Sequence, residues 1–494
     1  MNKQISRIAV AALAMIAALI AATTYWQTWA AGSLADRQDN AVKIVADYQI
    51  KRGLILTDQP RVVFAANRVV KTKGQTYYLR RYPTGGLAAQ TVGYSTGTQT
   101  GLERSLNDYL TGQNSNLGTV VRRLKDKLRG ATITGNDVVM TLRPHIQQLA
   151  ENRLDHTCGS VVALDPRTGR VLVMASSPTF NPNDARSHFG RILRIRAHCA
   201  PAAPLINRST QAHYVPGSTF KVVTATAALD STKITPDTLF SDPGYCVEYG
   251  KRIYNASNPD SGPETFGTLT FSQGLIHSVN SVFCNTGKRI GAARILDYAK
   301  RFGFYRKPPL ETPSDERSSS GLYRNGRLFD PKNPATQVDP GRLAFGQERL
   351  QVTPLQMAMV ASAVANHGVL MKPFVVDRIV APNGDVVTRT KPSVYSRPMK
   401  PNTAAELTTM MEGVVNEGTG TAAQMNVPVA GKTGTAETGR PGRYTSWFIA
   451  FAPADNPRVA VAVALENQTQ AGGVVAAPIA KTIMQALLAT PSNS

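Results

Sequence analysis

The chain carries a Ser-Thr-Phe-Lys tetrad at residues 218–221, between a predicted turn and a predicted buried helix. Proline and glycine end the segment 214–217, which predicts the turn. Residues 221–229 are apolar and rich in alanine, a pattern typical of a buried helix. Residues three apart lie on one face of a helix, so Lys221 could share a hydrogen bond with the Ser218 hydroxyl and act as its base. The serine would stand at a helix N-terminus, where N–H groups favour developing negative charge.

A tetrad of this kind is a weak signal by itself, because it occurs by chance in many chains of this length. Two further motifs follow it in order, Ser278-Val279-Asn280 and Lys432-Thr433-Gly434. Together the three motifs are the signature set of serine enzymes that react with penicillin. On these residues the chain resembles a class B penicillin-binding protein, a monofunctional peptidoglycan D,D-transpeptidase.

The resemblance extends beyond the motifs, over roughly residues 36 to 489. Segments similar to family patterns lie at residues 52–55, 101–103, 137–142, 159–169, 175–182, 345–356, 418–421 and 447–453. Two departures stand out. Val279 replaces a cysteine of many relatives, and we expect its side chain to point away from the site. The segment 184–196 carries four arginines and matches no family pattern.

The resemblance implies an α+β fold in three parts. These are a cytoplasmic tail and transmembrane anchor at 1–35, a non-catalytic pedestal or dimerisation-like domain at 36–155, and a penicillin-binding transpeptidase domain at 156–494. The last part should contain a central antiparallel sheet flanked by helices. Local patterns agree with a sheet, because 161–175 reads as a hairpin around a Pro-Arg-Thr-Gly turn and 459–465 as a strand. The pedestal range is too short for a glycosyltransferase module, which disfavours a bifunctional class A enzyme.

The first segment predicts a membrane helix. Lys3 and Arg7 precede an apolar and aromatic stretch at residues 8–29, about 22 residues and long enough to cross a bilayer. The preceding positive charge predicts a cytoplasmic N-terminus, and one span then places the catalytic domain outside the bacterial cell membrane. A cleaved signal peptide is the alternative, but no Ala-x-Ala site follows the apolar run. Residues 36–48 read as a polar helix leading away from the membrane.

The composition is that of a globular protein with a strongly basic net charge of +22 (55 − 33). Nucleic acid is rejected as a partner, because no helix-turn-helix, zinc-finger or RNA-stacking motif is present and the bulk of the chain is exported. A basic surface facing an anionic envelope and a merely solvated surface both remain open.

The four cysteines, Cys158, Cys199, Cys246 and Cys284, lie in an exported domain and are therefore permitted to form disulfides. Three pairings are possible, and the sequence does not choose among them. Cys284 also reads as a core residue of a helix that contains Asn280. The cysteine spacings do not suit zinc, and no metal or cofactor is implied. His213, His277 and Glu437 lie near motifs and are interpreted as structural.

The resemblance assigns roles to the three motifs. Ser218 would attack a D-Ala–D-Ala stem peptide, and Lys221 would take its proton. For that, Lys221 must be neutral, which burial and the second cation Lys432 would favour. Ser278 would bridge the lysines and relay a proton to the leaving D-alanine, while Asn280 would hold the substrate amide.

The third motif would form the substrate-binding strand, with Thr433, Gly434 and Thr435. The two threonines would bond the terminal carboxylate or the substrate backbone. The oxyanion hole would come from the N–H groups of Ser218 and Thr435, by analogy with the family. An acceptor amine from a second stem peptide would resolve the acyl-enzyme into a cross-link.

The predicted function is therefore peptidoglycan cross-linking by serine acyl transfer, inhibited by covalent β-lactam acylation. The alternatives are a D,D-carboxypeptidase or β-lactam hydrolase, and a β-lactam-binding scaffold. Stem peptides and β-lactams are the predicted ligands, and a membrane glycosyltransferase with divisome or elongasome proteins are the expected partners. The sequence does not distinguish a role in septation from one in elongation or sporulation.

Overall fold

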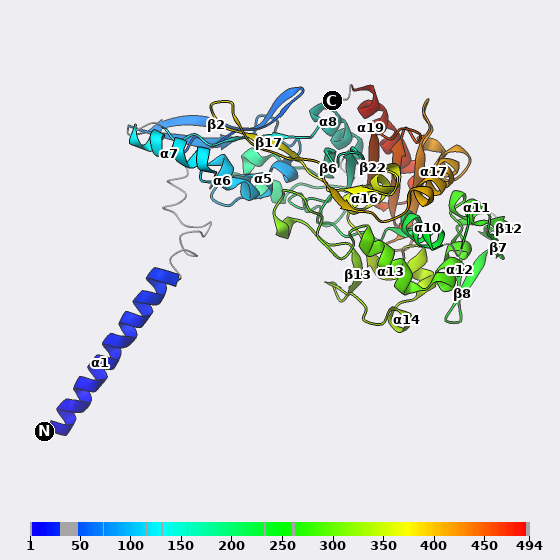
Figure 1. Ribbon diagram of the computed structural model, residues 1–494, viewed down its shortest axis with the longest axis horizontal. Helices are drawn as coiled ribbons and strands as arrows, with labels where there is room; N and C mark the ends of the chain where they lie inside the picture. The colour runs from blue at the N-terminus through cyan, green and yellow to red at the C-terminus, as the bar shows by residue number, and fades with distance from the viewer. Residues whose placement is uncertain are drawn as a thin grey trace.

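The computed structural model describes residues 2–29, 48–72, 74–114, 116–129, 132–155, 157–231, 234–258 and 262–490. The predicted polar helix at 36–48 lies almost wholly outside these ranges. Beyond the N-terminal helix the chain forms two sheet-based parts, one with the six-stranded sheet and the other with the five-stranded sheet (Figure 1).

The N-terminal helix α1 spans Asn2–Thr24 and continues as a π-helical turn over Tyr25–Trp29. Its apolar side chains are exposed, and Lys3–Thr28 is long and apolar enough to cross a membrane. A second stretch, Gly472–Ala489, passes the same test but is partly buried against the five-stranded sheet. The first segment thus fits a single membrane span, and the second is a core element.

The six-stranded sheet carries the pedestal and has the order β18-β17-β4-β1-β2-β3. Its strands are β1 (Ile55–Asp58), β2 (Arg61–Thr72), β3 (Gln75–Arg81), β4 (Asp137–Met140), β17 (Val376–Val380) and β18 (Val386–Arg389). Short helices accompany it, namely α4 (Ala89–Val92), α5 (Gly101–Ser105), α6 (Asn107–Leu110) and α7 (Leu117–Leu128). Figure 1 shows β17 crossing from the later part of the chain to lie at this end of the molecule. The pedestal sheet therefore takes two strands from within the range 156–494, and the division at residue 155 stays a prediction.

The five-stranded sheet is antiparallel throughout, in the order β20-β21-β22-β5-β6. Its strands are β5 (Gly159–Leu164), β6 (Val171–Ser177), β20 (Ala430–Glu437), β21 (Tyr444–Ala452) and β22 (Val459–Gln468). Successive strand residues point to opposite faces, so Val161 and Ala163 pack on one side and Val162 and Leu164 on the other. The predicted hairpin, strand and antiparallel sheet are confirmed.

Helices cover both faces of this sheet. One face packs against α8 (Pro144–Leu154) and α19 (Ala477–Ala489), and the other against α16 (Pro354–Ala365) and α17 (Pro401–Asn416). Helix α10 (Lys221–Asp230) packs against α17 and other helices. All ten residues of α10 are buried, as its apolar sequence predicts. The other helices that position the site are α11 (Phe271–Ile276), α12 (Asn280–Ile290), α13 (Ala292–Arg301), α15 (Pro340–Ala344) and α18 (Gly472–Val475).

Two disulfides resolve the pairing that the sequence left open. Cys158 bonds to Cys199 and Cys246 to Cys284, across separations of 41 and 38 residues. The first joins the start of β5 to a surface loop, and the second joins β8 (Tyr245–Glu248) to α12. Cys284 is both buried and cross-linked. Such bonds stabilise a fold mainly by restricting the unfolded chain.

The arginine-rich segment forms a short 3₁₀ turn (Pro182–Ala185) and helix α9 (Phe189–Leu193). Arg186 stacks on the Tyr48 ring at 4.6 Å from its centroid, and Arg191 lies 3.8 Å from Asp184. This segment therefore contacts Tyr48, the first residue of the described range 48–72.

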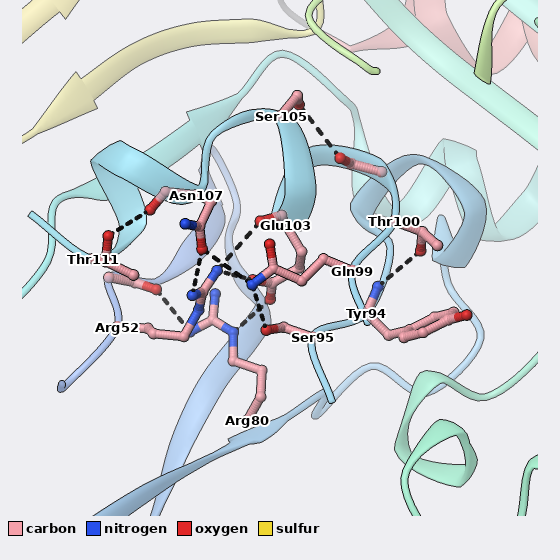
Figure 2. Close-up of polar contacts among 12 residues, drawn as sticks. Arg52, Arg80, Tyr94, Ser95, Gln99, Thr100, Glu103, Ser105, Asn107 and Thr111 are labelled. Carbon is pink, nitrogen blue, oxygen red and sulfur yellow. Dashed lines mark hydrogen bonds and ion pairs between the residues drawn. The ribbon is translucent and has the colours of Figure 1, made fainter. Parts of the chain in front are cut away.

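A buried ion cluster organises the pedestal. The Glu103 carboxylate is fully buried and lies between the guanidinium groups of Arg52 and Arg80, as Figure 2 shows. Arg52 also donates to Asn107 Oδ1 at 2.8 Å. Burial by itself would raise the pKa of Glu103, but the attraction and hydrogen bonds of Arg80 and Arg52 hold it below its ordinary value. The carboxylate joins α5 to β3 and to the segment that precedes β1.

We predict that Glu103→Gln destabilises the protein by about 3 to 5 kcal/mol, because it leaves two guanidinium groups buried without their carboxylate. Urea unfolding checks this loss. The matched variant Glu406→Gln removes an exposed carboxylate of α17 and should change stability by no more than about 0.5 kcal/mol.

The pH dependence of this effect has a defined sign. Since the folded-state pKa of Glu103 is lowered, its stabilisation is complete above the ordinary glutamate range and disappears as pH falls through the folded pKa. The stability difference between wild type and Glu103→Gln should therefore shrink in acid. A difference that stays constant down to the lowest accessible pH would contradict the assignment.

Candidate active site

The Ser218 turn is held against the edge of the five-stranded sheet. Ser218 lies in a 3₁₀ turn (Gly217–Phe220) that leads into α10, and its side chain is half-buried. Trp447 of β21 donates its indole N–H to the Val215 carbonyl at 3.0 Å. A Cβ at Gly434 would lie 2.9 Å from Thr219 Cγ2, so only glycine allows strand β20 to approach the turn this closely.

Ser278 lies in the connection between α11 and α12 and has a left-handed backbone with φ +59°. This conformation is uncommon for a residue other than glycine and needs support from its surroundings. Two hydrogen bonds supply it, Ser278 N–H to the Leu275 carbonyl at 3.1 Å and Val279 N–H to the Gly274 carbonyl at 2.9 Å. Val279 itself is buried in the hydrophobic core.

The three motifs meet around the Ser278 hydroxyl. Lys432 Nζ donates to Ser278 Oγ at 2.8 Å, and Lys221 Nζ lies 3.3 Å from the same oxygen. Lys221 Nζ also donates to the Ser278 carbonyl at 2.6 Å and to Asn280 Oδ1 at 2.8 Å. The Asn280 amide in turn donates to the Tyr254 carbonyl at 3.1 Å. Residues from α10, the 277–280 connection and β20 thus form one hydrogen-bonded group.

The hydrogen bond that the tetrad suggested between Ser218 and Lys221 is not formed in the described part of the chain. Lys221 instead directs its amine to three acceptors in the second motif. These contacts hold the amine at the second motif. Catalytic hydrogen bonds are often loose before substrate binds, so this geometry leaves Ser218 as a candidate nucleophile.

Both lysine amines are deeply desolvated. Lys221 and Lys432 have no exposed side-chain surface, and neither forms an ion pair with any residue that the structure describes. Burial first, and then the charge of Lys432, hold the pKa of Lys221 well below its ordinary value. Burial lowers the pKa of Lys432 to about 7. At neutral pH the pair therefore tends to carry fewer than two protons, and one amine is available as a base.

Strand β20 borders the Ser218 turn as an edge strand. Thr433 Oγ1 is hydrogen-bonded to Thr419 Oγ1 at 2.6 Å, and Thr435 Oγ1 accepts from the Gly472 N–H at 3.3 Å. An edge strand has backbone groups that no neighbouring strand uses, so it can pair with an extended peptide. Glu437 is exposed and ends this strand.

Sequence reasoning missed a buried carboxylate behind the second motif. Asp242 accepts hydrogen bonds from Ser281 Oγ at 2.6 Å, from the Asn255 amide at 2.9 and 3.0 Å, and from the Gly244 and Phe266 N–H groups, both at 2.9 Å. Asn255 Oδ1 accepts the Ser281 N–H at 2.9 Å. These bonds fix the first turn of α12 beside Asn280. Asp242 lies in a Ser-Asp-Pro-Gly segment, which by sequence is typical of a turn, so no signal in the sequence marked this carboxylate as part of the site.

The histidines near the motifs have structural partners. His213 Nε2 is hydrogen-bonded to the Tyr323 hydroxyl at 2.9 Å, and the His277 ring stacks on Phe266 with 5.3 Å between centroids. Among the described residues, one group is close enough together to hold a metal ion, namely Cys158, Cys199 and Glu466. The two cysteine sulfur atoms of this group are bonded to each other as a disulfide.

Comparison of the chain with known proteins identifies its family. A model of the penicillin binding protein transpeptidase domain matches residues 159–485, and a model of the penicillin binding protein A dimerisation domain matches residues 52–138. The peptidoglycan D,D-transpeptidase PbpA of Mycolicibacterium smegmatis is 33% identical over 99% of each chain. The chain belongs to the penicillin-binding protein transpeptidase family.

Solved structures of relatives extend the likeness to about nine tenths of this penicillin-binding protein. Penicillin-binding protein A of Mycobacterium tuberculosis, solved as a ceftriaxone acyl-enzyme, has a TM-score of 0.79 at 30% identity and covers 90% of this chain and 100% of that one. The penicillin G acyl-enzyme of the same protein has a TM-score of 0.74 at 30% identity, and the match covers 89% of this chain and 100% of that one. The predicted family, the α+β fold and the dimerisation-like pedestal are confirmed.

We predict that Lys432→Met stabilises this penicillin-binding protein at neutral pH, by roughly 4 kcal/mol, while it impairs acylation. The folded-state pKa of Lys432, about 7, lies below the ordinary value of 10.5, so the cost to folding grows as pH falls below 10.5 and is complete below about pH 7. That penalty fades as pH rises towards 10.5. Urea unfolding at a series of pH values measures the gain.

The control is Lys391→Met, which removes an exposed lysine and should show no such pH-dependent gain. A Lys432→Met protein that is less stable than wild type at pH 7, or equally stabilised from pH 7 to pH 10, would show that the buried amine is not desolvated as described.

Proposed function

We propose that this chain cross-links peptidoglycan by acyl transfer at Ser218, as a D,D-transpeptidase. The observation that carries the proposal is the pair of buried lysine amines that share the Ser278 hydroxyl beside the Ser218 turn. Such a pair supplies a base at neutral pH and retains a positive charge for an anionic substrate.

Each motif then has a part in the reaction. Ser218 Oγ attacks the penultimate D-alanine carbonyl of a stem peptide while Lys221 takes the hydroxyl proton. The C–N bond breaks, and the terminal D-alanine leaves with a proton relayed through Ser278. An acceptor amine next attacks the Ser218 ester, so a new amide forms and the serine hydroxyl is restored.

The remaining residues bind substrate in this proposal. Thr433, Gly434 and Thr435 form the edge against which the peptide lies, and the Lys432 charge attracts its terminal carboxylate. Asn280 holds the substrate amide, with its own orientation set by the Tyr254 carbonyl. The N–H groups of Ser218 and Thr435 form the oxyanion hole.

The membrane arrangement follows from the N-terminal helix. We infer one span with a cytoplasmic N-terminus, because Lys3 and Arg7 precede the apolar stretch, and this orientation places the pedestal and catalytic parts outside the membrane. Nascent glycan must reach the site from a glycosyltransferase, so a membrane enzyme of that class within a division or elongation complex is the partner we propose.

We predict that Ser218→Ala abolishes covalent labelling by a fluorescent penicillin and leaves the urea unfolding midpoint unchanged. Ser218 is half-buried and does not belong to the core, so its loss removes the nucleophile alone. The control Ser272→Ala, on α11, should label at the wild-type rate. Labelling of Ser218→Ala at that rate would show that another residue is acylated.

The lifetime of the acyl-enzyme separates a transpeptidase from a hydrolase. Within the described residues no carboxylate contacts Ser218, Lys221, Ser278 or Lys432, so we see no general base for a deacylating water. We predict that the penicillin adduct of the full chain persists for many minutes, measured by intact-protein mass spectrometry. Rapid multiple turnover of penicillin would instead support the hydrolase alternative.

A further inference from the structure

A cavity away from the candidate active site lies at the junction of the pedestal and the catalytic sheet. Its volume is about 390 Å³, within the range of small-molecule sites, and none of the eight proposed site residues lines it. Charged side chains dominate its wall. The arginines are Arg143, Arg167, Arg170, Arg378, Arg389 and Arg458, and the aspartates are Asp58, Asp165 and Asp377. Cations therefore exceed carboxylates by three (6 − 3).

The three carboxylates already have arginine partners. Asp377 binds Arg170 at 2.8 Å and Arg378 at 2.6 Å, and Arg378 also pairs with Asp58. Asp165 lies 3.6 Å from its neighbour Arg167. These pairs leave no carboxylate for the remaining arginines.

Those remaining arginines come from three separate elements. Arg143 precedes α8 and donates to the Gln59 carbonyl at 3.3 Å, and Arg458 precedes β22 and donates to the carbonyls of residues 488 and 490 at 3.4 and 3.3 Å. Arg389 ends β18 and is exposed. None of the three forms an ion pair with a residue that the structure describes, although each guanidinium has five donors.

Like charges also face one another around this cavity. Arg378 and Arg389 are directly opposite in the antiparallel β17–β18 pair, an arrangement that destabilises a sheet. Burial, and then the charge of Arg389, lower the pKa of Arg378. Burial, and then Arg170, lower that of Arg143. A bound anion would relieve both repulsions at once.

We propose that this cavity binds an oxyanion with at least two negative charges, held by Arg143, Arg389 and Arg458. Guanidinium groups match phosphate and carboxylate oxygens in bidentate geometry, and they remain charged at all physiological pH values. A diphosphate and the free carboxylates of an uncross-linked wall peptide both offer this chemistry. The proposal does not rest on the transpeptidase function, because none of the proposed catalytic residues takes part.

Calorimetric titration of the full chain in a non-ionic detergent tests this at physiological ionic strength. One arm uses inorganic pyrophosphate, and the other uses a soluble stem peptide with free carboxylates. We expect saturable binding of at least one probe. The double variant Arg389→Gln/Arg458→Gln should weaken it about 100-fold, roughly tenfold for each lost charged donor group.

The control Arg68→Gln/Arg327→Gln removes the same charge from exposed positions outside the cavity and should change the affinity by no more than about twofold. Should the double variant fail to fold, Arg143→Gln tests the same wall and should weaken binding about tenfold. Binding of pyrophosphate alone identifies a phosphate ligand, and binding of the peptide alone a wall peptide. Absence of saturable binding in both arms, or equal weakening in variant and control, overturns the proposal.

Discussion

The site depends on two lysine amines buried together without a carboxylate. Lys221 and Lys432 reach the Ser278 hydroxyl from a helix and from a strand that are separated by more than 200 residues of chain. Their ordinary protonated forms would be strongly unfavourable in this position, so the fold itself lowers both pKa values. A base thus exists at neutral pH because the surrounding core has displaced water from it.

The surrounding structure keeps this unfavourable arrangement in place. Helix α10 is buried on all sides, which fixes Lys221, and Lys432 lies in a strand paired along its length with β21. The second motif is less regular, with Ser278 in a left-handed conformation. It is held from behind by Asp242, whose hydrogen bonds reach Ser281, and by the disulfide between Cys246 and Cys284. The hydrogen bonds of Asp242 and the disulfide therefore support the uncommon backbone conformation of Ser278.

The sequence predicted the parts of this arrangement that are local. An apolar, alanine-rich helix and an alternating hairpin leave direct patterns, and α10 and β5–β6 lie where those patterns place them, while the strand at β20 was expected from the family resemblance. Pairings across the chain leave none. Nothing local in 376–389 indicates that β17 and β18 complete the pedestal sheet, and four cysteines are compatible with three pairings. Nor did any pattern indicate that Lys221 would turn to Asn280, since that choice depends on donors and acceptors brought together by folding.

Positive charge gathers at two places in this protein, the candidate active site and the cavity at the pedestal junction. The first uses lysines and the second uses arginines, and the difference has a physical reason. A desolvated lysine can release its proton, and the site beside Ser218 requires that release because one amine must act as a base. Arginine keeps its charge, so the six guanidinium groups at the pedestal junction cannot lower their repulsion by deprotonation. Three aspartates pair with half of them, and the other three have no carboxylate partner among the described residues. The strongly basic composition, which by itself left a solvated surface and an anionic partner equally open, therefore favours an anionic partner at this junction.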